Sequence, residues 1–364
     1  MDSKFKVLSL FSGIGGLDLG FGGDVTVHKG SIASMDWIEM ESSTKDFVNL
    51  KRTPFKTVFQ NDIIDGAKQV CVMNGIASNY HVRSIVDLIE EDFLFPYADV
   101  VIGGFPCQPF SMCGNRKGFS DERGTLYKSF VTVVQRTKPK VFVAENVCGI
   151  LTMAGNPIQQ IIDDFSDLGY NVKYQVVKSN EFGVPQTRKR VIIMGILKSV
   201  EEQLPELPDD WNVISENRIQ CHIGKYFEHL AEPNDSTDVS QMLYSGTKKL
   251  LKGQGQTAVK MSSPAMTVRA EHHGQIEFRR HANNPEQKPE RRLTVREVGL
   301  IQTFSPDFQF VINGTMAQPY RFIGNAVPPL LGYIIARKVE RIIGKYFTAR
   351  SSPSSAVLPA SSSD

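Results

Sequence analysis

The sequence has no long hydrophobic run, few cysteines and almost no net charge. No window approaches the about 18 apolar residues of a transmembrane helix, so we expect no membrane span. The apolar run near the N-terminus ends after roughly seven residues, which is too short for a secretory signal peptide. The five cysteines form no Cys-x-x-Cys pair, which argues against a disulfide framework or metal site and favours the reducing cytoplasm. A formal charge of +2 gives no general attraction to nucleic acid, so such a role must depend on local charge.

Short apolar runs alternate with helix-like stretches through most of the N-terminal part of the 364 residues, a length that suggests two domains. The candidate strands cover residues 5–11, 56–60, 99–103, 141–144, 172–177 and 191–196. The candidate helices between them cover residues 63–73, 126–135 and 157–168. This alternation predicts an α/β fold with a parallel, doubly wound sheet.

The pattern changes near residue 199, where acidic residues and prolines become frequent and the strand–helix alternation fades. We therefore expect a second, irregular domain over residues 199–290. The last helix is predicted over residues 325–345, where apolar residues recur on one stripe and two prolines suit the first turn. The tail over residues 347–364 is rich in Ser, Pro and Ala and is predicted to be disordered.

A glycine-containing loop, Phe11-Ser12-Gly13-Ile14-Gly15-Gly16, follows the first predicted strand and opens a helix. The dinucleotide-binding pattern Gly-x-Gly-x-x-Gly is not completed, because Asp18 stands at the last glycine position. The loop is therefore either a tight strand–helix turn or a ligand-binding loop at the carboxyl end of a strand.

A nucleoside site would need an acidic side chain at the end of the second strand, where it can bond ribose hydroxyls. Asp36 has the usual spacing of about 20 residues from the glycine loop, whereas Asp62 follows the better strand. We prefer Asp62 because it lies between a strand and a helix, and residues 24–54 then form an insertion. Either carboxylate has a simpler explanation as a helix cap or a solvated surface group.

Cys107 lies between Pro106 and Pro109, directly after a buried strand. The prolines restrict the residues before them to extended conformations, which predicts a stiff turn that presents the thiol. Cys107 is therefore a candidate nucleophile, provided that nearby cations raise its thiolate fraction at neutral pH. Most free cysteines are structural, and three others are assigned to that group: Cys71, Cys148 and Cys221.

Two further polar groups are expected at strand ends. Glu145 ends one strand, where a carboxyl group beside a nucleophile can donate a proton. Gln186, Arg188 and Arg190 lead into another strand, and alternate residues of a strand share one face. Their amide and two guanidinium groups can bind an anion or a carbonyl oxygen. Each group alone has an ordinary structural explanation, but together they combine an acid, a nucleophile and oxygen-binding cations.

Five motifs, in this order, resemble those of the C5-cytosine DNA methyltransferases of the bacterial restriction-modification type. They are Phe-Ser-Gly-Ile-Gly-Gly (11–16), Gly-Phe-Pro-Cys-Gln-Pro-Phe-Ser (104–111), Glu-Asn-Val (145–147), Gln-Thr-Arg-Lys-Arg (186–190) and Gly-Asn-Ala-Val-Pro-Pro (324–329). The resemblance covers nearly the whole chain except the middle domain and the tail. It implies a Rossmann-like S-adenosylmethionine-dependent methyltransferase sheet with a smaller, irregular target recognition domain.

The resemblance also implies the roles of individual residues. Cys107 would be the nucleophile, Glu145 would contact the base, and Arg188 and Arg190 would line the base pocket. The residues expected to bind S-adenosylmethionine are Phe11, Gly13, Gly15, Gly16, Asp62, Ile63, Ser84, Ile85, Pro106, Leu126 and Asn325. The family's Gly-Asp-Ile motif at the third strand is replaced by Arg83-Ser84-Ile85.

By the same resemblance, the thiolate would add to C6 of a cytosine that has been flipped out of duplex DNA. A loop over residues 112–127, with three glycines, would close over the DNA. The catalytic domain would consist of residues 1–198 and 321–346, with a hinge at 291–320. We expect a monomer in the prokaryotic cytoplasm, working beside a cognate restriction endonuclease and needing no metal.

The predicted recognition domain separates its charges. Residues 199–247 hold two basic and ten acidic side chains, a net of −8, whereas residues 248–292 hold ten basic and four acidic ones, a net of +6. Side chains of the basic half that are able to read bases in the major groove are Gln254, Gln256, Thr267 and Arg269. For each of these residues alone, a solvated surface is the simpler explanation.

The sequence leaves three alternative functions open. A tRNA cytosine-5 methyltransferase would share the chemistry, although the basic, loop-rich domain favours DNA. A catalytically silent DNA-binding protein would have no need of Cys107, Glu145 and Arg190. A nicotinamide-dependent dehydrogenase lacks support because the third glycine is missing.

Overall fold

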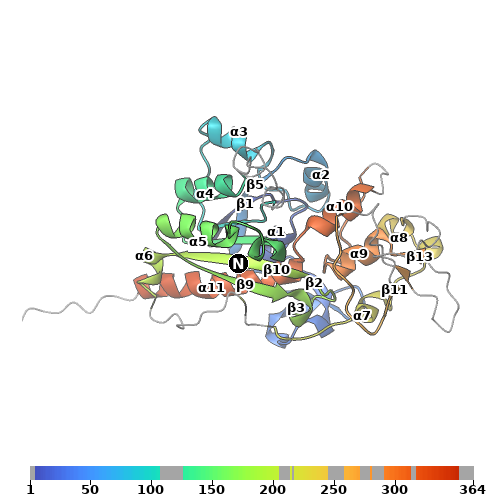
Figure 1. Cartoon of the computed structure of the whole chain (residues 1–364). Helices are drawn as coiled ribbons and strands as arrows, with labels where there is room; N and C mark the ends of the chain where they lie inside the picture. The colour runs from blue at the N-terminus through green and yellow to red at the C-terminus, as the bar shows by residue number, and fades with distance from the viewer. Residues whose placement is uncertain are drawn as a thin grey trace, which may run out of the picture.

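The computed structural model describes residues 5–106, 126–204, 214, 217–244, 258–270, 279–280, 291–312 and 317–351. Seven strands form the central sheet: β1 (Phe5–Leu10), β5 (Phe55–Asp62), β6 (Tyr80–Val82), β7 (Val100–Gly103), β8 (Val141–Val147), β9 (Tyr170–Lys178) and β10 (Lys189–Leu197). Their spatial order is β6-β5-β1-β7-β8-β10-β9, and Figure 1 labels β1, β5, β9 and β10 of this sheet. Neighbouring strands from β6 to β8 are parallel, whereas β10 runs antiparallel to both β8 and β9.

Helices cover both faces of this sheet, which confirms the predicted doubly wound fold. The helices α1 (Gly16–Gly22) and α11 (Pro329–Ser351) pack on one face. The other face is covered by α3 (Ile85–Glu90), α4 (Leu126–Thr137) and α5 (Pro157–Asp167). Val7 of β1 belongs to the first core and Leu8 to the second, so this strand is buried on both sides, as is typical of a central parallel strand.

The sheet is mostly parallel, as predicted, and departs from this arrangement at one edge, where β10 is antiparallel to both neighbours. The strands β9 and β10 are joined by residues 179–188, which contain only a short 3₁₀ turn, Ser179–Glu181. A parallel neighbour would need a longer crossover connection, usually a helix. The antiparallel course of β10 brings its first residues to the same edge of the sheet as the carboxyl end of β8.

The segment 24–54 forms a separate antiparallel sheet of β2 (Thr26–His28), β4 (Phe47–Leu50) and β3 (Ile38–Glu41), in that order. It packs against α11, where the Trp37 and Tyr333 rings lie 5.5 Å apart and the Tyr333 hydroxyl donates to the Lys51 carbonyl at 3.0 Å. The predicted insertion is therefore a folded part of the core. Asp36 lies within it, in the 3₁₀ turn Met35–Trp37, away from the central sheet.

The second region is irregular, as predicted. Its described elements are α6 (Lys198–Glu201), α7 (Ile223–Phe227), α8 (Val239–Met242), β11 (Ala258–Val259), β12 (Arg279–Arg280), β13 (Arg291–Arg292) and α9 (Val295–Ile301). One hydrophobic core joins this region to α2 (Asp65–Met73) and α10 (Ala317–Asn325). The two regions therefore share buried side chains.

The predicted helix over 325–345 begins later than expected. Asn325 is the last residue of α10, and α11 starts at Pro329. Proline at position 328 disfavours the helical conformation of the residue before it, which explains the break. At its other end α11 continues to Ser351, so the predicted start of the tail at 347 is too early. Residues 352–364 lie outside the described residues.

Candidate active site

Most of the predicted site residues lie at the carboxyl edge of the parallel strands. The chain moves outward from β1 to β5 and β6 on one side, and through β7 to β8 on the other. The strand order therefore reverses between β1 and β7, and ligands of open α/β sheets bind in the crevice at such a point. Most of the predicted cofactor residues lie at or after the ends of β1, β5 and β6, whereas Pro106 follows β7, Leu126 begins α4 and Asn325 ends α10. Of the predicted catalytic residues, Glu145 lies near the end of β8, Arg188 precedes β10, and Arg190 lies at its start.

The glycine loop is held from both sides of Gly13. The Gly13 amide donates to the Asp62 carboxylate at 2.9 Å, and the Tyr80 hydroxyl donates to the Gly13 carbonyl at 2.9 Å. Gly13 and Gly15 adopt positive φ angles of 52° and 77°, which L side chains rarely tolerate. The structure thus places Asp62, and not Asp36, against the glycine loop, while Tyr80 is a contact that the sequence analysis missed.

The other predicted cofactor residues differ in solvent exposure. Ile63 is 70% exposed although it is apolar, and Pro106 and Asn325 are also exposed. Ser84 caps α3 by accepting a hydrogen bond from the Val86 amide at 3.2 Å. Other predicted contacts are partly or fully buried: Phe11, Gly15, Gly16, Ile85 and Leu126.

Gly16 has a packing role, because a side chain there would collide with the Val327 carbonyl. This close approach brings the chain after Asn325 next to the start of α1. Asn325 therefore belongs to the same neighbourhood as the glycine loop, although the two lie more than 300 residues apart in the sequence.

The buried carboxyl group of Asp18 is linked to the glycine loop by hydrogen bonds through Ser9. Asp18 in α1 is 6% exposed, and its two oxygens accept hydrogen bonds from the Ser9 and Thr57 hydroxyls at 3.0 and 3.2 Å. The Ser12 hydroxyl of the loop contacts Ser9 in turn at 2.9 Å. Burial raises the pKa of Asp18 to about 6, and the hydrogen bonds offset only part of that shift.

The Asp18 substitution to asparagine is expected to change how stability depends on pH. Because the pKa of Asp18 is higher in the folded than in the unfolded chain, wild-type stability falls as pH rises from about 4 to about 6, by about 3 kcal/mol in total, and then levels off. The asparagine side chain of Asp18→Asn cannot ionise, so the stability of this variant should not fall between about pH 4 and about pH 6 in this way. Urea unfolding of both proteins at several pH values tests this, and parallel profiles would contradict it.

Two of the four predicted catalytic residues form a polar pair at neighbouring strand ends. The Arg190 Nε lies 2.8 Å from the Glu145 Oε1, and both side chains are largely buried. Gly104 faces the other carboxylate oxygen, since a Cβ built on Gly104 would lie 3.2 Å from Glu145 Oε2. The Asn146 side-chain amide donates to the Phe105 carbonyl at 3.2 Å. The chain leading to Cys107 is therefore fixed beside the Glu145–Arg190 pair, while Cys107 itself lies outside the described residues.

Arg188 has a different environment from the predicted one. Its side chain is 1% exposed, and its guanidinium donates to the carbonyls of Val268 and Gly324, each at 3.0 Å. Burial, followed by the nearby Arg190 cation, lowers the pKa of Arg188 to about 9, so it remains charged at neutral pH. The predicted strand face shared by 186, 188 and 190 is not present, because β10 begins only at Lys189. Arg188 therefore joins the two regions, whereas the predicted role was to line an open pocket.

Two of the predicted DNA-reading residues can be placed. Arg269 is exposed and Thr267 is half-buried, in the segment that passes beside α10. Gln254 and Gln256 lie outside the described residues.

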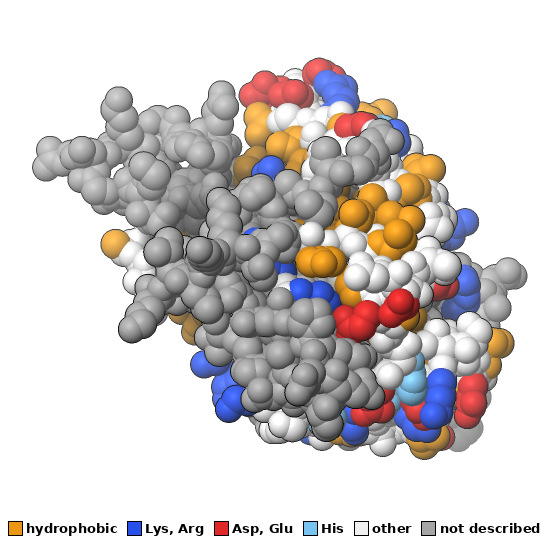
Figure 2. Space-filling view, turned by 90° about the vertical axis from the view of Figure 1, so that its right-hand side faces the viewer, with side chains coloured by type: hydrophobic (Ala, Val, Ile, Leu, Met, Phe, Trp, Pro, Cys, Tyr) orange, Lys and Arg blue, Asp and Glu red, His pale blue; other side chains and the backbone are white. Residues whose placement is uncertain are grey.

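Some of the oppositely charged side chains of this region form ion pairs with one another inside the protein. Arg291, from the basic half, is 5% exposed and pairs with Glu232 of the acidic half at 3.2 Å and with Glu297 at 2.8 Å. Figure 2 shows the side of the molecule that carries α8 and α10, where described basic, acidic and apolar side chains are intermixed. The basic side chains of this region are therefore not all available to a ligand.

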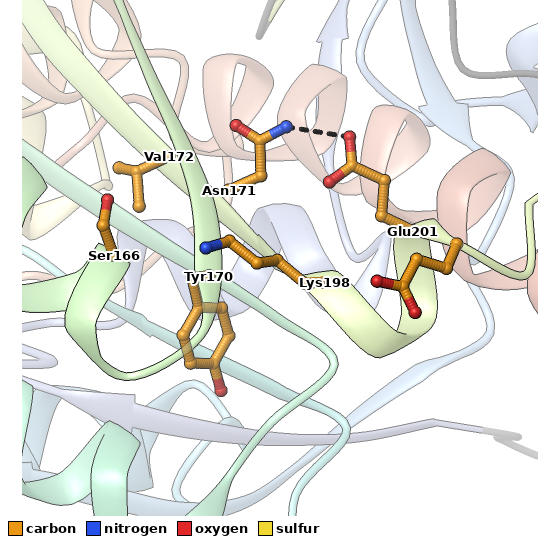
Figure 3. A pocket seen from close by; sticks show the side chains of 7 residues that line it. Ser166, Tyr170, Asn171, Val172, Lys198 and Glu201 are labelled. Carbon is orange, nitrogen blue, oxygen red and sulfur yellow. Dashed lines mark hydrogen bonds between the residues drawn. The ribbon is translucent and has the colours of Figure 1, made fainter.

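A surface hollow of about 410 Å³ lies at the opposite end of β10 (Figure 3). It is lined by Ser166, Tyr170, Asn171, Val172, Lys198, Glu201 and Glu202. Asn171 donates to Glu201 at 2.8 Å across it. None of these residues is a predicted site residue, so the hollow is separate from the strand-end site. Within the described ranges, no helix is long and apolar enough to cross a membrane and no cluster of ligating side chains could hold a metal ion.

Comparison with known proteins identifies the family of the chain. Residues 5–341 match the family described as C-5 cytosine-specific DNA methylase. The chain belongs to this family. The Type II methyltransferase M.NgoFVII of Neisseria gonorrhoeae is 34% identical over 349 residues, covering 90% of this chain and 84% of the relative. M.BspRI of Lysinibacillus sphaericus, also a Type II methyltransferase, is 31% identical and covers 94% of this chain and 83% of its own length.

A solved structure supports the fold independently. The S. pombe Dnmt2 methyltransferase superposes with a TM-score of 0.65 at 18% identity, over 94% of this chain and 99% of that one. The protein is thus a DNA cytosine-5 methyltransferase with a mostly parallel, Rossmann-like sheet. This identification excludes the dehydrogenase hypothesis.

Proposed function

We propose that the enzyme transfers a methyl group from S-adenosylmethionine to C5 of one cytosine in a specific duplex sequence. The observation that carries the proposal is the Glu145–Arg190 pair beside Gly104 and Phe105, the residues that lead to Cys107. An acid, a cation and a nucleophile at adjacent strand ends are the groups that addition to a cytosine ring requires.

The protein groups act on the base in a fixed order. The base is flipped out of the duplex, because stacking hides its C6 atom. The Cys107 thiolate then adds to C6, and electron density moves from the C5–C6 bond toward C5 and the ring. Glu145 bonds the ring at N3 and Arg190 bonds O2, which stabilises the developing negative charge. After methylation, loss of the C5 proton to a base restores the double bond and expels the Cys107 thiolate.

S-adenosylmethionine supplies the electrophilic methyl group when it is bound. The residues at the β1 and β5 ends fit this cofactor, because Asp62 places a carboxylate for sugar hydroxyls next to the exposed apolar side chain of Ile63. The positive φ of Gly13, with open space on its Cβ side, leaves room for a ligand near the backbone. Asn325 and Pro106 would border the same space, and Ser84 would approach it from the end of β6.

We assign residues 1–198 and 321–346 to the catalytic domain, 199–290 to the target recognition domain and 291–320 to the connection. Thr267, Arg269, Gln254 and Gln256 are the proposed base-reading residues. The enzyme is proposed to act as a monomer in the cytoplasm and to protect host DNA from a cognate restriction endonuclease. This last role rests on the Type II names of its relatives.

Transfer of tritium from labelled S-adenosylmethionine to duplex DNA, with tRNA as the competing substrate, tests the proposal. We expect label in the duplex and none in tRNA. Sequencing of methylated cytosines in DNA from cells that express the protein then gives the recognised site, and purified DNA from these cells should resist the cognate nuclease. Label in tRNA alone would contradict the proposal.

A further inference from the structure

In the predicted DNA-reading segment, both the backbone amide and the backbone carbonyl of Val268 bond buried side chains. The Val268 amide donates to the Gln186 side-chain oxygen at 2.9 Å, and the Val268 carbonyl accepts from Arg188 at 3.0 Å. Val268 lies between Thr267 and Arg269 in the sequence. The backbone position of these two side chains therefore depends on Gln186 and Arg188.

The same side chains also hold the turn that contains Asn325. The Gln186 amide donates to the Gln302 side-chain oxygen at 2.6 Å. The Gln302 amide donates in turn to the carbonyls of Ile323 and Ala326, at 2.6 and 3.0 Å. Arg188 donates to the Gly324 carbonyl at 3.0 Å. Three of the four backbone carbonyls from 323 to 326 therefore accept a hydrogen bond from Gln302 or Arg188.

The two segments also touch directly. A Cβ on Gly324 would collide with the backbone of Arg269 and Ala270, so only glycine allows this approach. Because the two backbones are in contact, a displacement of the segment at Arg269 is expected to displace the turn at Asn325 as well.

The side chains of Gln186, Arg188 and Gln302 thus form a bridge between the segment at Val268 and the turn at Asn325. Because this bridge is buried, small displacements break its hydrogen bonds. Gln186 and Gln302 are 0% exposed and Arg188 is 1% exposed. Water cannot replace a lost bond at such a depth, and an unmade bond of a buried polar group costs about 1–3 kcal/mol. The side-chain oxygen and nitrogen of both glutamines are already bonded, so rotation of one amide breaks bonds at both ends of the bridge.

We infer that Gln186, Arg188 and Gln302 are positioning residues that couple target recognition to cofactor binding. When the target sequence fixes the segment 267–269, the bridge fixes the turn at Asn325, so specific DNA and cofactor bind cooperatively. Coupling of this kind is reciprocal, because each ligand must raise the affinity for the other by the same factor. The inference rests on the proposed function, which assigns cofactor to Asn325 and DNA to Thr267 and Arg269.

The test uses the full chain, S-adenosylhomocysteine and a short duplex that contains the sequence identified by methylation sequencing. Calorimetric titration gives the dissociation constant of S-adenosylhomocysteine with and without the duplex, and the ratio is the coupling factor. We expect a factor of at least about 5 in the wild type and a value within about 2-fold of one in Gln302→Met. The gain in duplex affinity on adding S-adenosylhomocysteine should shrink by the same factor.

Gln241→Met is the matched control. Gln241 is also buried in the second region, where it donates to the Ala231 carbonyl at 2.7 Å and accepts from the Thr294 hydroxyl at 2.6 Å, without contact to the Asn325 turn. It should keep the wild-type coupling factor. If Gln302→Met does not fold, Gln302→Glu retains the acceptor for Gln186, removes both donations to the turn and should lose the coupling as well.

The possible results separate the inference from the function. Wild-type coupling in Gln302→Met, equal loss in Gln241→Met, or no coupling in a wild-type enzyme that methylates DNA would each overturn the inference alone. A wild type that binds no S-adenosylhomocysteine and methylates no duplex would instead overturn the proposed function.

Discussion

Replacing Cys107 by serine is expected to abolish methyl transfer to DNA. A serine hydroxyl is almost entirely protonated at neutral pH, whereas a cysteine thiol supplies a thiolate of high nucleophilicity. Removal of a nucleophile can cost about 10⁶-fold in rate, so we expect a loss of at least about 10³-fold in kcat. Incorporation of tritium from labelled S-adenosylmethionine into duplex DNA measures the loss.

The control for this variant is Cys221→Ala. Cys221 is 2% exposed in the second region and belongs to its hydrophobic core. This substitution should lower stability modestly and leave the methyl transfer rate per folded molecule unchanged. Full activity of Cys107→Ser would remove Cys107 from the mechanism, whatever the control shows.

Glu145→Gln is expected to lower kcat by about 10²- to 10⁴-fold, the range in which a positioned proton donor contributes. The amide keeps the shape of the carboxyl group and an oxygen for Arg190, which lies 2.8 Å from Glu145 in the wild type. It cannot pass a proton to the base. We therefore expect a large loss of kcat with little change in the affinity for DNA, measured by single-turnover kinetics and a duplex binding titration.

Glu181→Gln is the matched control for the charge change. Glu181 pairs with Arg218 at 3.1 Å and with Lys178 at 2.9 Å on the surface, outside the strand-end site. Its activity should equal that of the wild type. A similar loss in both variants would show that the effect comes from the altered charge and not from the position of Glu145.

Much of the fold could be predicted from the sequence, because strands buried on both faces carry a strong local signal. The run Val100-Val101-Ile102 and the run Val191-Ile192-Ile193 are apolar on both faces, and both are central strands. The glycine loop and Asp62 could likewise be placed by their position after a strand, where the structure puts them in contact.

Other features could not be predicted because they depend on contacts between distant segments. The direction of β10 follows from the short 179–188 connection and from its pairing with β8, neither of which local periodicity reports. The folding of residues 24–54 on α11 depends on contacts such as that of Trp37 with Tyr333, which are 296 residues apart in the sequence.

The sequence by itself determined which residue types stand at the strand ends, and therefore the chemistry of the site. It placed Glu145, Arg190 and the approach to Cys107 in motifs whose order marks the family. Only the tertiary structure decided that Arg188 and Arg190, two residues apart, differ in role. Arg190 meets Glu145 at the sheet edge, whereas Arg188 is buried against the Val268 and Gly324 carbonyls. The physical reason is that a guanidinium can bind a carboxylate or backbone carbonyls equally well, and packing, which is not encoded locally, selects the partner.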